Sequence, residues 1–80
     1  MTSEQMRAAR EAHPFRPFTL RMTDGRSFRI PHRDYVSVSP GGRTVIVYQA
    51  DESFSILDLL LATELSVDPP PQQPAEGGAG

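Results

Sequence analysis

The residues most able to do chemistry lie in one short polar stretch, Pro31-His32-Arg33-Asp34-Tyr35. On a strand, His32 and Asp34 would point to the same side, as a metal-binding pair or an oriented catalytic base requires. The sequence holds no cysteine, no third ligand at a recognisable spacing and no phosphate-cradling glycine loop. A turn between two strands explains the same residues, with Pro31 ending one strand and Asp34 stabilising the bend. We therefore predict no catalytic residue, no metal and no cofactor, and place enzymatic activity third among the functions considered.

A second set of residues suits binding. In the hairpins predicted below, Arg21 and Arg29 share an outer face with Arg33 near one end, and Tyr35 and Tyr48 point outward from the next hairpin. Arginines and aromatic rings on a sheet bind single-stranded nucleic acid through charge attraction and base stacking. The same residue types are enriched at protein–protein interfaces. These five residues are therefore candidates for binding either nucleic acid or protein.

Charge is unevenly distributed along the chain. All eight basic residues are arginines between Arg7 and Arg43, a span with three acids and a net charge of +5. From Thr44 onward there are six acids and no base. One interpretation is a basic surface for phosphate or an acidic partner. The other, which we favour because the total charge is only −2, is that the two halves fold together and neutralise each other.

Length limits the protein to one small domain. Eighty residues give a thin core, which is itself a reason to self-associate. The longest apolar run, Leu59-Leu60-Leu61-Ala62, is far shorter than the ~20 residues of a membrane span. The N-terminus lacks the basic start and apolar stretch of a secretory signal. We expect a soluble cytoplasmic protein with no membrane partner and no small-molecule ligand.

The first predicted element is a helix over about residues 3–13. Thr2 and Gln5 have the spacing of a capping box, in which each side chain bonds to the backbone of the other residue. Met6, Ala9 and His13 form a narrow apolar stripe at helical spacing. Pro14 disfavours helical dihedrals at the residue before it, so the helix should end there.

From Phe18 onward the apolar pattern has the period of a strand. A two-residue turn at Asp24-Gly25 would place apolar residues opposite charged ones. A three-residue loop, Thr23-Asp24-Gly25 with Gly25 left-handed, keeps the faces separate. This register predicts the pairs Leu20–Phe28, Phe18–Ile30, Arg21–Ser27 and Thr19–Arg29.

Two further turns follow at Pro40-Gly41-Gly42-Arg43 and at Gln49-Ala50-Asp51-Glu52. The first predicts the pairs Val38–Val45 and Val36–Val47, with Tyr35, Ser37, Ile46 and Tyr48 on the opposite face. The second, taken as a four-residue turn, predicts Val47 opposite Phe54 and Val45 opposite Ile56.

The apolar phase then changes from even to odd positions, through Leu59, Leu61, Leu65 and Val67. A phase change inside a continuous segment indicates a bulge or a single helical turn, here at Leu57-Asp58-Leu59-Leu60. Residues 68–80 contain no large apolar side chain and are predicted to be a disordered Pro/Gly-rich tail. Within it, Pro71-Gln72-Gln73-Pro74 matches the spacing of polyproline ligands without a basic residue to orient one.

These elements predict a mainly β, α+β domain over residues 1–67, with an N-terminal helix and a five- or six-stranded antiparallel meander. The meander could close into a small Sm-like open barrel, or stay an open sheet with the helix across one face.

Several segments together resemble a family of short uncharacterised bacterial proteins: Pro14-Phe15-Arg16-Pro17-Phe18, Asp24-Gly25-Arg26, Pro31-His32, Ser39-Pro40-Gly41-Gly42-Arg43-Thr44-Val45 and Ile56-Leu57-Asp58-Leu59-Leu60-Leu61. The resemblance covers about residues 1–67 and implies a bacterial origin and one compact domain, but no activity. The leading functional hypothesis is a non-enzymatic interaction module that self-associates or docks onto a protein through its exposed sheet. The alternative is a nucleic-acid-binding small barrel that uses Arg21, Arg29, Tyr35 and Tyr48.

Overall fold

One helix and six strands make up residues 2–70, the part of the chain that the computed structural model describes. In chain order the elements are α1 (Ser3–Glu11), β1 (Phe18–Met22), β2 (Ser27–Ile30), η1 (Arg33–Tyr35), β3 (Val36–Val38), β4 (Thr44–Tyr48), β5 (Phe54–Asp58), η2 (Leu59–Leu61) and β6 (Ala62–Val67), where η marks a 3₁₀ turn. The strands form two antiparallel sheets, in the orders β2-β1-β6 and β3-β4-β5. The predicted α+β class, with an N-terminal helix and antiparallel strands, is confirmed.

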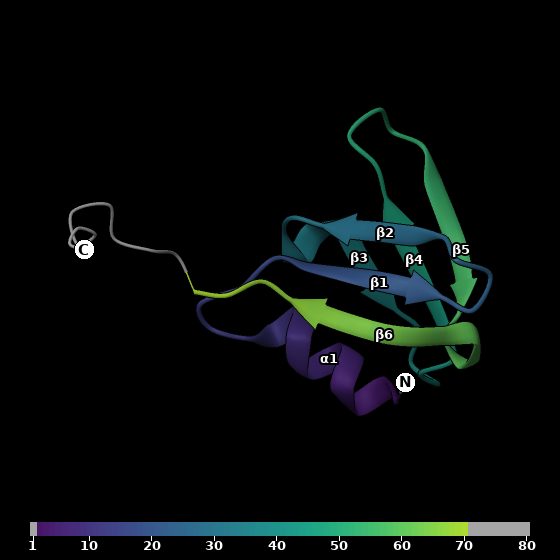
Figure 1. The fold of residues 1–80 in the computed structure, drawn as a ribbon, viewed down its shortest axis with the longest axis horizontal. Coiled ribbons are helices and arrows are strands. Elements are labelled where there is room, and N and C mark those ends of the chain that lie inside the picture. Colours follow the sequence, from purple (N-terminus) through teal and green to yellow (C-terminus); the bar gives the residue numbers. More distant parts are fainter. Residues whose placement is uncertain (1, 71–80) are drawn as a thin grey trace.

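The two sheets share one core. Figure 1 shows β1, β2 and β6 in front of β3, β4 and β5, with the two sets of strands crossing steeply. The chain passes between the sheets at two corners, the 3₁₀ turns η1 and η2, as in orthogonal sheet packing. Among the described residues no ladder joins β2 to β3 or β5 to β6, so the sheets are open. The core contains Met6, Phe18, Leu20, Met22, Ile30, Val36, Val45, Val47, Leu57, Leu59 and Ala62.

Helix α1 begins at the predicted capping box. The Thr2 hydroxyl accepts from the Gln5 N–H, and the Gln5 side chain accepts from the Thr2 N–H. The helix buries Met6 and ends at Glu11, so His13 lies beyond it and is exposed rather than part of an apolar stripe. The end comes earlier than predicted because Ala12 is already extended. No helix in residues 2–70 is long and apolar enough to cross a membrane.

Arginines of α1 cover the outer edge of β3. The Arg10 Nε donates to the Val36 carbonyl at 2.9 Å, and an Arg7 Nη donates to the Ser39 carbonyl at 2.7 Å. The Val36 carbonyl is one that the β3–β4 ladder leaves free, whereas the Ser39 carbonyl, just after β3, also accepts the turn bond from the Gly42 N–H. The helix therefore satisfies one of the edges of the β3-β4-β5 sheet.

The first hairpin has the predicted register. All four predicted pairs are present, and the loop is Thr23-Asp24-Gly25, closed by a bond from the Gly25 N–H to the Met22 carbonyl. Gly25 is left-handed, with φ +92°. The second hairpin is also as predicted, with Val38 opposite Val45 and Val36 opposite Val47.

The prediction for the β4–β5 turn is wrong by one residue. Gln49 pairs with Ser53, which leaves a three-residue loop, and Glu52 at its third position has φ +77°. The pairs are therefore Val47–Ser55 and Val45–Leu57, instead of pairs with Phe54 and Ile56. This shift turns Phe54 and Ile56 outward and places Leu57 in the core. The expected four-residue turn failed because a glutamate adopts a backbone conformation that usually favours glycine.

The bend before β6 is close to its predicted place, as η2. Of the apolar positions predicted to continue inward, Leu59 is buried and Leu65 is half-buried, but Leu61 and Val67 are 52% and 42% exposed. Instead Ala62 is buried, opposite Met22 at an irregularity in the β1–β6 register. The 3₁₀ turn rotates the chain, so the alternation restarts at a different residue.

Anchored structure continues past Val67 to Asp68. The Asp68 N–H donates to the Pro17 carbonyl, and the Arg16 guanidinium donates twice to the Asp68 carbonyl. The Asp68 side chain pairs with Arg29. Asp68, the residue after β6, is therefore held by contacts with the β1 and β2 side of the sheet. The polyproline-like segment, residues 71–74, lies outside the described residues.

Candidate interaction surface

The polar stretch that could have held chemistry forms a corner between the sheets. His32 and Asp34 are both exposed, and the backbone from Arg33 to Tyr35 makes the 3₁₀ turn η1. The His32 ring lies 6.0 Å from the Tyr35 ring, centroid to centroid. Within residues 2–70 no group of three histidines or acids could hold a metal ion. The prediction of a turn at this place is confirmed.

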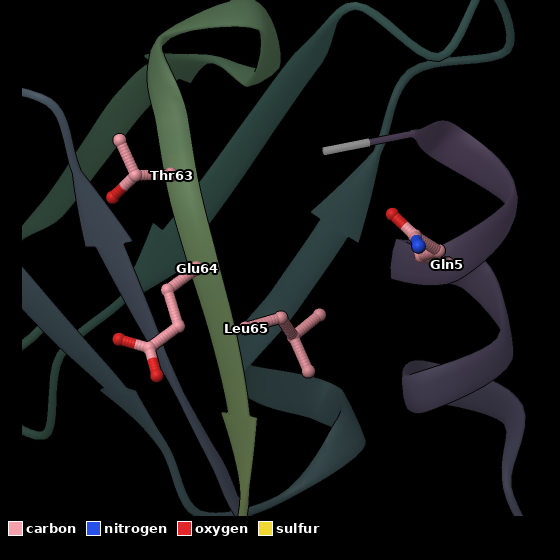
Figure 2. A pocket seen from close by; sticks show the side chains of 4 residues that line it. All are labelled: Gln5, Thr63, Glu64 and Leu65. Atoms are coloured by element: carbon pink, nitrogen blue, oxygen red, sulfur yellow. The ribbon is translucent and has the colours of Figure 1, made fainter.

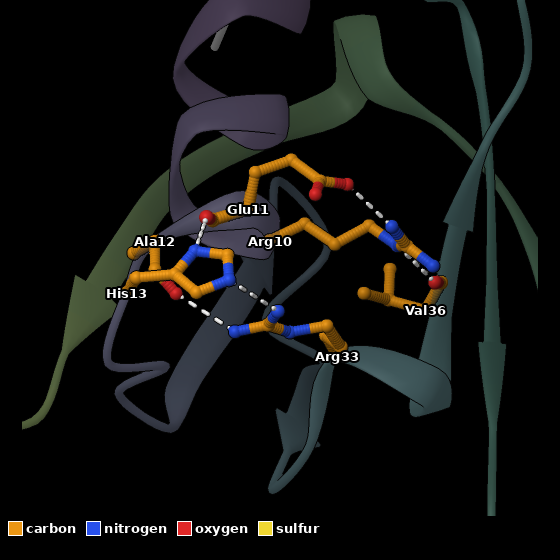
Figure 3. Close-up of polar contacts among 6 residues, drawn as sticks. All are labelled: Arg10, Glu11, Ala12, His13, Arg33 and Val36. Atoms are coloured by element: carbon orange, nitrogen blue, oxygen red, sulfur yellow. Dashed lines mark hydrogen bonds and ion pairs between the residues drawn. The ribbon is translucent and has the colours of Figure 1, made fainter.

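Arg33 is held by the end of the helix. Figure 3 shows its guanidinium between the Ala12 carbonyl, at 2.8 Å, and the His13 Nε2, at 3.3 Å. The His13 Nδ1 lies 2.8 Å from the Glu11 carbonyl, which can only accept, so Nδ1 carries the proton and Nε2 accepts from Arg33. This network joins η1 to the helix end, so Arg33 has a structural role at the corner.

Arg21 and Arg29 share the outer face of the β2-β1-β6 sheet, as predicted. Arg21 pairs with Glu64 at 3.0 Å, and an Arg29 Nη donates to the Asp68 Oδ1 at 2.8 Å. The hydrogen bonds from Arg29, together with its charge, hold the pKa of Asp68 below its ordinary value. These two pairs, and the pair of Arg43 with Asp58, join the basic part of the chain to its acidic part. This supports the interpretation that the two halves neutralise each other.

Tyr48 belongs to the other sheet, and Tyr35 lies in the turn that leads into it. Tyr48 points outward from β4, and Tyr35 lies at the end of η1, beside a hollow of about 270 Å³ that both residues line. The structure thus brings the two tyrosines together, but places Arg21 and Arg29 on a different sheet. Nucleic-acid binding by these four residues stays a prediction.

The outer face of β3-β4-β5 carries exposed apolar side chains in two rows. Tyr48 faces Phe54 across the strands, with ring centroids 6.2 Å apart, and Ile46 faces Ile56. Phe54 and Ile56 are 58% and 65% exposed, and Tyr48 is 39% exposed. We call these four residues the apolar face. Large apolar side chains that adjoin one another at the surface mark interaction sites.

Strand β5 has a free edge. Because Gln49–Ser53 is a hydrogen-bonded pair, alternation of the antiparallel ladder makes Tyr48–Phe54 and Ile46–Ile56 non-hydrogen-bonded pairs. The N–H and C=O groups of Phe54 and Ile56 therefore point away from β4. Since β5 is the last strand of its sheet, these groups have no strand partner among the described residues.

The other strand edges are better protected. α1 covers β3 and lies beside β6 (Figure 2), and β2 is four residues long, carries Arg29 and is followed by Pro31. Charges, short strands, prolines and covering helices are the usual ways of blocking edge pairing. β5 has neither a proline nor a bulge, and its one charged side chain, Asp58, is at its end.

Uncompensated acids lie next to the apolar face. Five ion pairs, all with arginine, are present among residues 2–70, and Asp34, Asp51 and Glu52 belong to none of them. Asp34 and Glu52 line the same hollow as the tyrosines. Hydrogen bonds from the Ser53 hydroxyl and N–H lower the pKa of Asp51. The end of the sheet that carries Tyr48 and Phe54 is therefore negatively charged.

A hollow of about 440 Å³ lies between α1 and β6, lined by Gln5, Thr63, Glu64 and Leu65. In Figure 2 Leu65 points from β6 toward α1, whereas Glu64 points away from the helix. The Gln5 side chain is used in the helix cap and Glu64 pairs with Arg21. The groups that line this hollow thus already have partners.

The predicted register places Phe54 and Ile56 inward, and assigns Glu52 to the turn without a role in binding, whereas both apolar side chains are exposed. A signal was present: Ala50-Asp51-Glu52 has its aspartate at the middle position, as Thr23-Asp24-Gly25 has. Each aspartate accepts a bond from the N–H two residues on, at 3.0 Å in Asp51 and 3.1 Å in Asp24. Aligning the two loops on these aspartates matches the observed register, although the residue type of Glu52 does not itself indicate a left-handed backbone.

Comparison of the chain with protein-family models, with curated proteins and with solved structures finds no match.

Proposed function

We propose that this protein is a non-enzymatic interaction module that docks through the outer face of β3-β4-β5. The observation that carries the proposal is the exposure of Phe54 and Ile56, more than half of each side chain, on a strand with an unpaired edge. Burying exposed apolar area contributes about 25 cal/mol per Å², so covering several such side chains is a substantial driving force.

The charge distribution supports this face over the opposite one. On the β2-β1-β6 sheet the outward arginines are paired with acids, and the surface is polar. On the β3-β4-β5 sheet the outward side chains of β4 and β5 are mostly aromatic or aliphatic. Interface centres are enriched in aromatic residues and depleted of charged ones.

Site-specific photo-crosslinking tests the proposal. A photoreactive amino acid is placed at Ile56, or at Thr19 on the opposite sheet as a control, in the cells that contain the protein. We expect discrete adducts, to another protein or to a second copy, from position 56 and not from position 19. No adduct at position 56, or equal adducts at both positions, would contradict the proposed function.

A further inference from the structure

The free edge of β5 and the acids beside it indicate what kind of partner fits. We propose, building on the function proposed above, that the partner is an extended protein segment that adds to β5 as a fourth strand. Such a segment would carry apolar side chains beside Ile56 and Phe54, and a basic side chain beside Glu52.

The backbone groups of β5 that face away from β4 favour the addition of a strand. Phe54 and Ile56 present both an outward side chain and an outward N–H and C=O, so one added strand can bond to the backbone and cover the apolar groups at once. Antiparallel addition is expected, because that ladder is the more stable. A second, independent feature, the charge, then selects the partner.

Charge complementarity favours a basic segment. Asp34, Asp51 and Glu52 have no arginine partner, whereas all eight arginines are engaged: Arg7, Arg16 and Arg33 with carbonyls, the other five with carboxylates. A second copy of this chain therefore offers only arginines that already donate hydrogen bonds within their own fold. An apolar strand that ends in arginine or lysine supplies the missing positive charge.

Register sets where that charge must be. On an antiparallel partner, the residues opposite Ile56 and Phe54 come at alternate positions, and the chain then continues toward the β4–β5 loop that holds Glu52. The segment should thus have two apolar residues at alternate positions, followed toward its C-terminal end by a basic one. The glutamate side chain lies on the correct side, since Glu52 lines the hollow with the outward-facing Tyr48.

The test uses a capped eight-residue peptide of the sequence Thr-Val-Thr-Val-Thr-Arg-Thr-Arg. The control peptide has glutamates in place of the arginines. With the full chain at low salt, we expect the arginine peptide to bind at least about tenfold more tightly, and to weaken as salt is added. Hydrogen exchange should slow at the Phe54 and Ile56 amides and stay unchanged at the Leu57 amide, which already bonds to β4.

Two variants separate edge pairing from simple adhesion. Ile56→Pro removes an N–H that the β4 ladder does not use, so the fold should persist while peptide binding is lost. Ile56→Val keeps that N–H and should bind within about threefold of the wild type. Glu52→Gly should raise the melting temperature of the protein and yet reduce its preference for the arginine peptide. A variant that is more stable but binds less selectively shows that the change in binding does not come from unfolding.

Three results would overturn the proposal that a basic segment adds to β5. They are equal binding of the two peptides, no binding at millimolar concentration, and binding with no protection of the Phe54 and Ile56 amides. Protection of those amides in the protein alone, with a doubled mass in light scattering, would assign the edge to a second copy instead. If position 56 still gives crosslinks while the arginine peptide fails, the docking function stands and only the partner chemistry is wrong.

Discussion

Single residues with left-handed backbone set the registers on which the surface depends. Gly25 and Glu52 occupy the third position of two three-residue loops with the same closing bonds, at φ +92° and +77°. In the first loop the residue type predicts the conformation, and the register could be derived from the sequence. In the second it does not, because a glutamate gives no sign that it will be left-handed.

Replacing Gly25 by alanine should destabilise the fold by about 1 kcal/mol or more, because a Cβ is disfavoured in the left-handed region. No atom lies within 4 Å of the position that the Cβ would occupy, so the cost comes from the backbone alone. Urea denaturation measures it, with Gly41→Ala, where φ is not left-handed and the space is also open, as the matched control. Equal effects at both positions would contradict the assigned loop.

Replacing Glu52 by glycine should stabilise the fold. The left-handed conformation costs a non-glycine residue about 1–2 kcal/mol, and the glycine variant avoids this cost. The greater conformational freedom of glycine in the unfolded chain offsets part of the gain in stability. We expect a net stabilisation of about 0.5 kcal/mol, measured by urea denaturation. A clear loss of stability would mean that the Glu52 side chain contributes to the fold.

Acid should weaken the fold through its aspartates. Hydrogen-bond donors hold the pKa of Asp24, Asp51, Asp58 and Asp68 below the ordinary value of 3.8. A carboxyl with a lower pKa in the folded state contributes stability above its unfolded pKa and loses it as the pH falls through its folded pKa. The melting temperature should therefore fall as the pH drops below about 4.

NMR titration of the Asp68 carboxyl checks the cause. Because Arg29 is the main source of the lowered pKa, Arg29→Ala should return Asp68 toward its ordinary value, while Asp51 should not change. A wild-type Asp68 that titrates at or above the ordinary value would contradict the ion pair.

At the scale of elements, the features that could be predicted follow from residue types over a few positions, as the helix cap and the first two hairpins do. The outward turn of β5 follows from the length of the β4–β5 loop, in which a glutamate takes the left-handed position where a glycine would have marked the loop. The restart of β6 after η2 depends on how the chain rounds a corner between two sheets, which alternation alone does not encode. Alternation therefore predicts only half of the apolar face: it places Ile46 and Tyr48 outward, but Phe54 and Ile56 inward.

Truncation separates the anchored end of β6 from the segment after it. Residues 69–80 contain no apolar side chain larger than alanine or proline, so a chain ending at Asp68 should keep its stability within about 0.5 kcal/mol. Ending at Ala62 should unfold the protein, because β6 pairs with β1 along its length and Leu65 packs on the core. Thermal denaturation of both chains tests this. A large loss on ending at Asp68 would show that residues beyond it hold the fold.

At the scale of the whole molecule, the two sheets differ in what they show to solvent. The outer face of β2-β1-β6 pairs arginines with acids, some from the other end of the chain, and is complete in itself. The outer face of β3-β4-β5 leaves apolar side chains exposed, one strand edge unpaired and three nearby acids without an ion-pair partner among the described residues. In Figure 1 the β4–β5 turn lies at the end of the molecule away from α1, where the helix cannot cover it. This asymmetry is the basis of the proposed docking function.

Residue-resolved NMR of the isotope-labelled protein in a lysate of its own cells tests that claim most directly. We predict that the amide signals of Ile46, Tyr48, Phe54 and Ile56 broaden or shift relative to buffer, and that Ile56→Ser abolishes the change without unfolding the protein. Signals of Thr19, Arg21 and Arg29 on the opposite sheet should stay in place. Signal changes confined to the opposite sheet, or no signal change on either face, would contradict docking through the outer face of β3-β4-β5.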